Sequence, residues 1–314
     1  METLELTAKE YKNLFDKPYH TFISTQFIEL QSTRFNSIHY LAFKDSKIQI
    51  GIVLAETENR LISPVSAPFG GFNITKPSIS ISTIETVISC LEDYAINRNK
   101  NIEITLPPFF YSSDFISKCI FVFEKSKFKV SYVDLNYQIQ IDLSQEYSEI
   151  IDYNAKRNLK ISSNTKYSFT KVTSLSDIER AFEIIKINRE TKGYPLRMTL
   201  ENVLNTIKII PADFFILEML GKEIAAAQVF HVANNIVQVI YWGDIPGFNE
   251  YKPMNELAYR IYEYYKNQNI KIIDIGPSSE SGIANYGLCE YKESIGCSVT
   301  LKYKFQFEIT SPIK

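Results

Sequence analysis

The residues best suited to chemistry lie near the end of the chain, where an acid, a flexible loop and a lysine follow a buried strand. The apolar run at 270–275 is typical of a strand, and it ends at Asp274 and Gly276. A loop of small polar residues leads to a short amphipathic segment, 286–295, which contains Lys292. Sites in open α/β sheets collect at the carboxyl ends of strands. We therefore expect Asp274, Gly276 and Lys292 to lie at a site.

These residue types suit the transfer of an acyl group to an amine. An ammonium group beside the strand end could stabilise the oxyanion that forms during the transfer, or hold a phosphate of the donor. Asp274 could orient the incoming amine or accept its proton. Alternatives stay open: Lys292 could be a solvated lysine paired with Glu290 or Glu293, and Asp274 could cap the next turn. Asn285 could donate to a substrate carbonyl, although capping of the following helix is favoured.

A basic segment and an aromatic pair supply further candidates for substrate binding. Arg157, next to Lys156, could bind a carboxylate or phosphate, because Arg favours bidentate recognition. A solvated basic helix face is the alternative. Tyr241 and Trp242 end a strand and could line a cleft. Because strand neighbours face opposite ways, we expect one of the two to pack in the core.

The first half of the chain offers one loop of interest, the Pro/Gly-rich segment 64–71. It contains Gly70 and Gly71, and a flexible loop at a sheet end could close on a substrate. A plain turn fits the same residues equally well.

Length, charge and composition limit the class of protein. A chain of 314 residues can bury one large core or two ordinary ones. The formal net charge of −2 provides no global basic field to attract nucleic acid or an anionic membrane, although local basic patches stay compatible with it. No apolar run approaches the length of a membrane span, and the first 13 residues lack the apolar region of a signal peptide. We expect a cytoplasmic protein.

The cysteines and histidines do not suggest a metal centre. The four cysteines have no C-x-x-C spacing, so we expect reduced and mostly buried thiols. The three histidines are scattered through different expected elements. We therefore expect no metal site and no serine-type triad.

The chain repeats one order of elements: hairpin, loop, helix, strand, helix, strand. In the first half, we expect the hairpin at 38–43 and 48–55, helices at 79–97 and 112–124, and strands at 102–106, 127–133 and 137–143. In the second half, we expect the hairpin at 214–220 and 224–232, strands at 236–242, 270–275 and 298–307, and helices at 254–267 and 286–295. Between the copies, Ser144 is expected to cap a helix, Ser174 or Ser176 a second one, and a third runs from Leu200. The repetition predicts an α/β fold of the mixed-sheet α+β type with two tandem domains, 1–143 and 144–314.

Four segments of the second half follow one another in a fixed order and spacing. They are I-D-L-S with N-A-K-R-N-L-K-I-S, G-K-E-I-A-A-A-Q-V-F, Y-W-G-D with N-E-L-A-Y-R-I-Y-E-Y-Y, and I-I-D-I-G with G-L-C-E-Y-K-E-S-I-G. Together they cover most of residues 141–305 and resemble the GNAT acyltransferase superfamily. More narrowly, they resemble its Fem-type branch and bacterial GNAT-like relatives, which pair two GNAT domains in one chain. The resemblance implies tandem GNAT-like domains and a role for Lys292, since the lysine of the family's Phe-Lys pair lies at the transfer site.

The resemblance also implies a reaction, the transfer of an acyl or aminoacyl group to an amine on a small or peptide-like acceptor, without a metal. Many CoA-using GNAT enzymes have a Gly-rich pyrophosphate loop before the central helix, but here the position reads G-D-I-P-G-F. Fem-type enzymes also lack that loop, because their donor is an aminoacyl-tRNA. Acyl-CoA therefore stays open as donor, and so does aminoacyl-tRNA. The net charge gives no support for tRNA, and the sequence shows no long helical arm of the kind that Fem-type enzymes using tRNA often carry. The alternative is a non-catalytic GNAT-shaped protein that binds a ligand or a partner.

Overall fold

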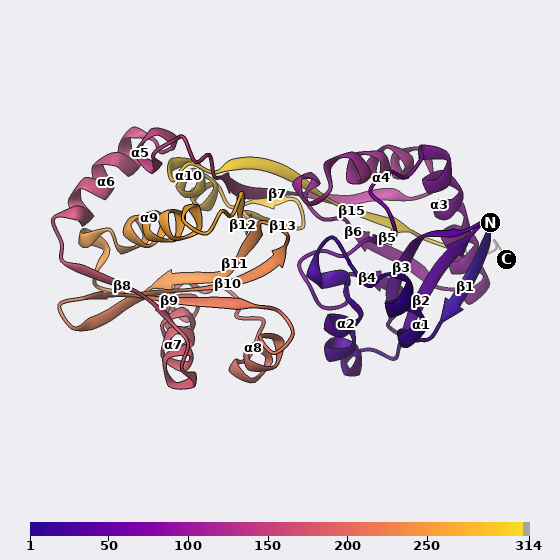
Figure 1. The fold of residues 1–314 in the computed structure, drawn as a ribbon, viewed down its shortest axis with the longest axis horizontal. Helices are drawn as coiled ribbons and strands as arrows, with labels where there is room; N and C mark the ends of the chain where they lie inside the picture. The colour runs from indigo at the N-terminus through magenta and orange to yellow at the C-terminus, as the bar shows by residue number, and fades with distance from the viewer. Residues whose placement is uncertain (310–314) are drawn as a thin grey trace. The chain divides into compact units, whose positions relative to one another are not determined.

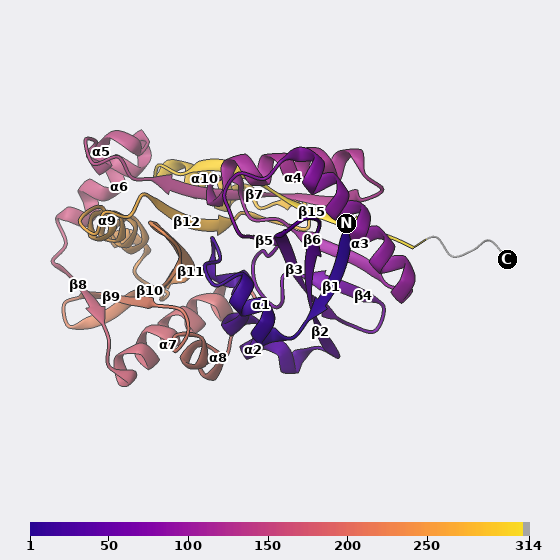
Figure 2. The ribbon, with the colours of Figure 1, turned by 45° about the vertical axis from the view of Figure 1, so that its right-hand side comes forward.

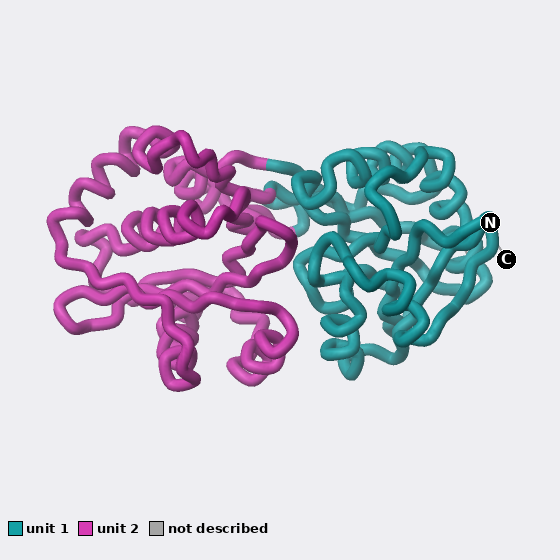
Figure 3. The backbone as a smooth tube through the Cα atoms, in the orientation of Figure 1, with its two compact units in different colours: residues 1–135, 281–283, 300–314 teal, residues 136–280, 284–299 magenta. Residues whose placement is uncertain are grey.

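The computed structural model describes residues 1–309, and its contacts divide the chain into two compact units (Figures 1 and 3). Unit 1 contains residues 1–135, 281–283 and the described residues from 300 on. Unit 2 contains residues 136–280 and 284–299. Two long strands, β7 (Lys129–Gln140) and β15 (Ser298–Phe307), contribute residues to both units. Among residues 1–309, no helix combines the length and the apolar character that a membrane crossing requires.

The sheet of unit 1 is built around the hairpin that the sequence predicted. Strand β2 (Ser37–Lys44) pairs antiparallel with β3 (Ile48–Glu56) across the polar turn. Strand β1 (Glu2–Leu6), which was not predicted from the sequence, pairs with β2. The other strands of the unit are β4 (Arg60–Ser63), β5 (Phe72–Ile74) and β6 (Asn101–Thr105), and β15 pairs antiparallel with β6.

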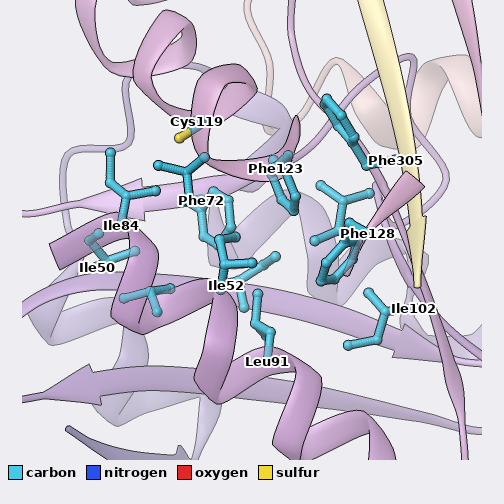
Figure 4. Packing of buried hydrophobic residues seen from close by; sticks show 14 of the residues in the cluster. Ile50, Ile52, Phe72, Ile84, Leu91, Ile102, Cys119, Phe123, Phe128 and Phe305 are labelled. Carbon is cyan, nitrogen blue, oxygen red and sulfur yellow. The ribbon is translucent and has the colours of Figure 1, made fainter. Parts of the chain in front are cut away.

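Two helices, α3 (Ile81–Arg98) and α4 (Ser113–Lys125), close the main core of unit 1 (Figure 4). The Ser80 side chain accepts a hydrogen bond from Thr83 and so caps the start of α3. The helix predicted at 79–97 carries apolar residues at helical spacing, 84, 87, 88, 91 and 95, and all five are buried. They pack with alternate residues of β3, and the Phe123 and Phe305 rings stack at 4.6 Å. The helices α1 (Ala8–Leu14) and α2 (Thr25–Gln31) contribute to a separate apolar cluster formed by the other residues of β2 and β3.

In unit 2 the strands follow the spatial order β7, β12, β11, β10, β9, β8. Their bounds are β8 (Tyr167–Val172), β9 (Ala212–Met219), β10 (Lys222–Ala233), β11 (Ile236–Asp244) and β12 (Ile272–Pro277). Neighbouring strands are antiparallel except β11 and β12, which are parallel. The pairing of β9 with β10 confirms the second expected hairpin.

The helices of unit 2 cover both faces of this sheet (Figures 1 and 2). Helix α9 (Pro253–Lys266) packs on one face against Ala225 and Ala227 of β10. Helices α7 (Leu175–Lys192) and α8 (Leu200–Thr206) pack on the other face, against Ala226. This alternation along β10 follows from the period of two in a strand. Helix α10 (Tyr286–Ser294) precedes β15 in the chain.

Two sequence predictions were wrong in this region. The expected strands at 127–133 and 137–143 are one strand, β7, which continues through the buried polar residues Asp134 and Asn136. The expected single helix after Ser144 is two helices, α5 (Tyr147–Ile150) and α6 (Tyr153–Ser163). Ile151 is extended between them, and the Asp152 side chain caps α6 through a 2.6 Å hydrogen bond from the Ala155 amide.

Candidate functional site

The parallel strands β11 and β12 pair over only three positions, 236–238 with 272–274. Gln238 and Asp274 form the last pair, and both strands continue beyond it, to Asp244 and Pro277. We call this point the fork. It lies toward the carboxyl ends of two parallel strands, where sites gather in α/β sheets.

Asp274 is fully buried at the fork and holds it together. Its Oδ2 accepts a hydrogen bond from the side-chain amide of Gln238 at 2.8 Å. Its Oδ1 accepts from the side-chain amide of Asn136 at 2.9 Å and from the Gly276 backbone amide at 2.8 Å. Gly276 has φ of 76°, a left-handed conformation that favours glycine. The carboxylate therefore joins β7, β11 and the turn after Ile275, as the turn-capping alternative requires.

Lys292 reaches the same turn from α10. Its side chain is 2% exposed, and Nζ donates to the carbonyl oxygens of Ile275 at 3.1 Å, Gly276 at 2.8 Å and Pro277 at 2.9 Å. The ammonium also lies 5.5 Å from the centre of the Tyr137 ring. The alternative of a solvated lysine paired with a neighbouring glutamate is therefore wrong.

Burial changes the acidity of this lysine. Removal of Nζ from water lowers the pKa of Lys292 to about 8, against the opposing influence of Cys297 and Asp274. A lysine with this pKa exchanges its proton close to neutral pH, whereas an ordinary lysine stays charged. The side chain can therefore act both as a cationic donor and, once deprotonated, as a base.

Helix α10 holds Lys292 in place because both of its ends are fixed. At the start, Asn285 Oδ1 accepts from the Leu288 amide at 3.0 Å, which is the expected capping interaction. The exposed Asn285 also donates through Nδ2 to the Tyr194 hydroxyl at 3.4 Å. At the end, Gly296 has φ of 87°, and the Cys297 amide donates to the Lys292 carbonyl at 3.0 Å.

Tyr241 and Trp242 lie on β11 beyond the fork and belong to the two opposite faces of the sheet. Tyr241 is buried in the cluster under α7, and its hydroxyl accepts from the Arg197 amide at 3.2 Å. Trp242 is partly buried in the cluster under α9, with its ring 6.2 Å from that of Tyr291 in α10. Both rings therefore pack in a core, where only one was expected.

Two further residues, Arg189 of α7 and Tyr194 after that helix, were not predicted from the sequence. The Arg189 guanidinium lies 5.0 Å from the centre of the Tyr241 ring and 5.7 Å from that of Tyr194. Through Tyr194 and Asn285, these residues connect Tyr241 to the start of α10. A signal was present, because Arg189 lies at helical spacing from the buried residues Phe182 and Ile185, and a charge on an apolar stripe is unusual.

The remaining candidates lie in other parts of the chain. Gly70 and Gly71 belong to unit 1, where their amides donate to the Thr105 carbonyl at 2.9 Å and to Ser63 Oγ at 3.0 Å. Both glycines are buried, so this loop is held by hydrogen bonds and not free in solvent. Lys156 and Arg157 are exposed on α6, and neither side chain forms a hydrogen bond or an ion pair within residues 1–309.

The structure offers little for a phosphate at the position of a GNAT pyrophosphate loop. Helix α9 starts with Pro253, which has no N–H, and the side chain of its N-cap residue, Lys252, makes no capping hydrogen bond within the described chain. The amides of Asn255 and Glu256 donate back to the Lys252 carbonyl at 3.1 and 3.3 Å. In the part of the chain that is described, no group of three His, Cys, Asp or Glu residues could hold a metal ion.

The sequence matches no protein-family model and no curated protein, but solved structures match over almost its whole length. FemX superposes with a TM-score of 0.68 at 11% identity, over 100% of this chain and 98% of that chain. The structure of L-PGS from Bacillus licheniformis superposes with a TM-score of 0.62 at 12% identity, over 98% of this chain and 94% of that chain. A tandem GNAT protein from the clavulanic acid biosynthesis pathway superposes with a TM-score of 0.52 at 8% identity, over 97% of each chain.

This chain has the GNAT/Fem-like fold. The α/β class and the two tandem GNAT-like domains predicted from the sequence are confirmed. At identities of 8 to 12%, the likeness concerns the path of the chain, so the roles of individual residues must be argued from this structure alone.

Proposed function

We propose that this chain is an N-acyltransferase that moves an acyl or aminoacyl group from an activated donor to an amine acceptor. The observation that carries the proposal is the buried ammonium of Lys292 beside the fork. A cation in a dry site is costly unless it is well paired, and its three partners here are neutral carbonyls. Groups whose pKa is shifted by burial concentrate at functional sites.

The reaction needs an oxyanion stabiliser, and Lys292 is suited to that role. The amine nitrogen attacks the donor carbonyl, a C–N bond forms, and the carbonyl oxygen becomes an oxyanion. Of the three contacts of Nζ, the one to the Pro277 carbonyl is only partly buried, and Pro277 itself is exposed. We assign the oxyanion to the position of this contact. Lys292 Nζ would then give up its hydrogen bond to the Pro277 carbonyl and donate to the developing oxyanion instead.

Completion of the reaction requires a leaving group and a proton. The bond from carbon to the leaving atom breaks, which is sulfur for a CoA thioester or oxygen for an aminoacyl-tRNA. The departing atom takes up the proton that the amine nitrogen releases. Asp274 is assigned as a positioning residue here, because its oxygens already accept from Gln238, Asn136 and Gly276. The exposed Lys156 and Arg157 are assigned to an acidic part of a substrate.

The proposal is tested by incubating the protein with acyl-CoA thioesters and with aminoacyl-tRNAs, each against a panel of amines, and detecting N-acylated products by mass spectrometry. We expect product with one donor class, and loss of turnover in Lys292→Ala. Lys271→Ala is the matched control, because Lys271 is an exposed lysine directly before β12, away from the contacts of Lys292. Wild-type turnover in Lys292→Ala would remove the role given to that residue.

A second function, non-catalytic ligand or partner binding, is favoured by the complete hydrogen bonding of Lys292. All three protons of its ammonium are already engaged within the protein. Thermal shift separates the two functions cheaply, because a ligand that binds only the folded state raises the melting temperature. Stabilisation by CoA thioesters supports the enzyme. Absence of stabilisation and of product, together with a protein recovered by pull-down, supports the binder.

A further inference from the structure

Arg189 of helix α7 is a partly buried cation. Within residues 1–309, its guanidinium forms no salt bridge, and its buried Nε has no hydrogen-bond partner. Burial lowers the pKa of Arg189, and only the Tyr241 and Tyr194 hydroxyls act in the opposite direction. A desolvated guanidinium that is flanked by two aromatic rings but lacks an anion is an incomplete ion pair.

Two acids of unit 2, Glu280 and Asp244, are already engaged with other residues. Glu280 pairs with Arg197 at 2.7 Å, and Asp244 accepts from Asn188 at 3.1 Å and from Lys192 at 3.4 Å. Because no acid within residues 1–309 forms an ion pair with Arg189, a bound anion from outside the protein would compensate its charge.

A second buried polar group lies beside the same ring. Gln228 of β10 is the cross-strand partner of Tyr241, so the two side chains are neighbours on the α7 face of the sheet. Gln228 is 0% exposed, and neither its Nε2 nor its Oε1 has a hydrogen-bond partner among the residues that the structure describes. Buried amides in folded proteins are almost always paired. Two unpaired polar side chains therefore flank Tyr241.

We propose that Arg189 binds an oxyanion of the acceptor, a carboxylate or a phosphate, and that the Gln228 amide completes this subsite beside Tyr241. The inference rests on the proposed function, since it gives the acceptor amine an anionic group. A guanidinium donates in a planar fork that matches both anions. The subsite lies beyond the fork on β11, so the acceptor would extend from Lys292 toward α7.

The charge of Arg189 also connects this subsite to Lys292. Burial, and to a smaller degree the positive charge of Arg189, lower the pKa of Lys292. An anion that neutralises Arg189 removes part of that repulsion, so the pKa of Lys292 rises when the acceptor binds. This coupling gives a readout that a purely structural arginine would not produce.

The test compares matched pairs of amines that differ only in the anion, by ligand-observed NMR in the absence of any donor. The carboxylate arm uses L-amino acids against their carboxamides, and the phosphate arm uses O-phosphoethanolamine against ethanolamine. We expect the anionic member of one arm to bind about tenfold to hundredfold more tightly than its neutral counterpart. The arm in which this happens identifies the anion.

Variants assign the preference to the residue. Arg189→Met should remove the preference and Arg189→Lys should reduce it, while Lys186→Met, an exposed lysine on the same helix, should retain it. Gln228→Leu should weaken binding, and unchanged binding would overturn the part assigned to Gln228. An NMR titration of Lys292 with and without the anionic probe should show the pKa rise. The inference is overturned if no probe binds, if both members of each pair bind equally, or if Arg189→Met binds the anionic probe as the wild type does.

The two proposals fail separately. Anion binding that depends on Arg189, without product from any donor, removes the transferase and leaves the subsite. Product formation from anionic acceptors that is the same in Arg189→Met removes the subsite and leaves the transferase.

Discussion

Lys292 Nζ donates a hydrogen bond to the Gly276 carbonyl oxygen at 2.8 Å, while the Gly276 amide donates to Asp274 Oδ1, also at 2.8 Å. One left-handed glycine therefore connects the cationic and the acidic candidate. A change at either side chain disturbs the same turn, so its effect on stability has to be measured beside its effect on turnover.

The pH dependence of stability should reveal Lys292. Its pKa is about 8 in the folded protein and 10.5 in the unfolded chain, so between these values the unfolded chain binds more protons. Stability of the wild type relative to Lys292→Met should therefore rise with pH from about 8 to about 10.5, by about 1.4 kcal/mol per pH unit. Urea unfolding across this range measures the difference. Lys271→Met is the control, and a flat difference would show that the pKa of Lys292 is not lowered.

Asp274 should be needed for stability because it accepts from three buried donors. In Asp274→Ala, the amides of Asn136, Gln238 and Gly276 lose their acceptor, and we expect the free energy of unfolding to fall by about 3 kcal/mol or more. Asp274→Asn should lose less, since its oxygen still accepts from Gly276. Denaturant melts of the two variants should therefore rank in that order, and equal losses would be inconsistent with the hydrogen bonds described.

Gly243 at the end of β11 should not tolerate a larger residue. A Cβ there would lie 2.3 Å from the side chain of Asn188, which is fixed by a 2.7 Å hydrogen bond to the Asp244 carbonyl. Gly243→Ala should lower the free energy of unfolding by about 1–3 kcal/mol. Gly287→Ala is the control, because it lies in α10, where an added Cβ would meet Asn285 Oδ1 at an ordinary contact distance of 3.9 Å, and it should stabilise the protein by up to about 1 kcal/mol. Thermal melts that show two effects of the same sign would contradict this.

Asp213 should contribute stability that is lost in acid. Burial would raise its pKa, but hydrogen bonds from His231, Lys171 and Tyr265 lower it to about 2. The contribution is therefore complete above the unfolded value of 3.8, and it disappears as the pH falls toward 2. The pH-dependent advantage of the wild type over Asp213→Asn should be about 2 kcal/mol. The free energy of unfolding of the wild type and of Asp213→Asn should be measured from about pH 6 to about pH 2. Parallel curves for the two proteins would refute the prediction.

Much of the fold was predictable because local patterns determine it. The buried stripe of α3 follows from apolar residues that recur with the helical period of 3.6. Both hairpins follow from strand-like runs that are joined by polar turns. The long strand β7 was missed because Asn136 interrupts its apolar pattern. The partner of that residue, Asp274, is distant in the sequence, so no local rule can show that the polar side chain is satisfied inside the protein.

The site was predictable to a different degree. Sequence position placed Asp274, Gly276 and Lys292 at one strand end, and the structure brings them into one set of hydrogen bonds. The partners of Lys292 are backbone carbonyls, which residue types cannot reveal. Arg189 was missed because a charge on a helix is normally taken as exposed, and only the packing of Tyr194 and Tyr241 shows that it is partly buried.

The length of β7 has a consequence for dissecting the gene. Residues 136–138 hold unit 2 through hydrogen bonds from Asn136 to Asp274, from Tyr137 to Glu293 and from Gln138 to Ser298. A fragment cloned from codon 144 onward, at the domain boundary suggested by the sequence, would lack the strand that flanks β12. A chimera that exchanges the halves of two related genes would have the same defect, because residues 136–138 have to stay with the rest of unit 2.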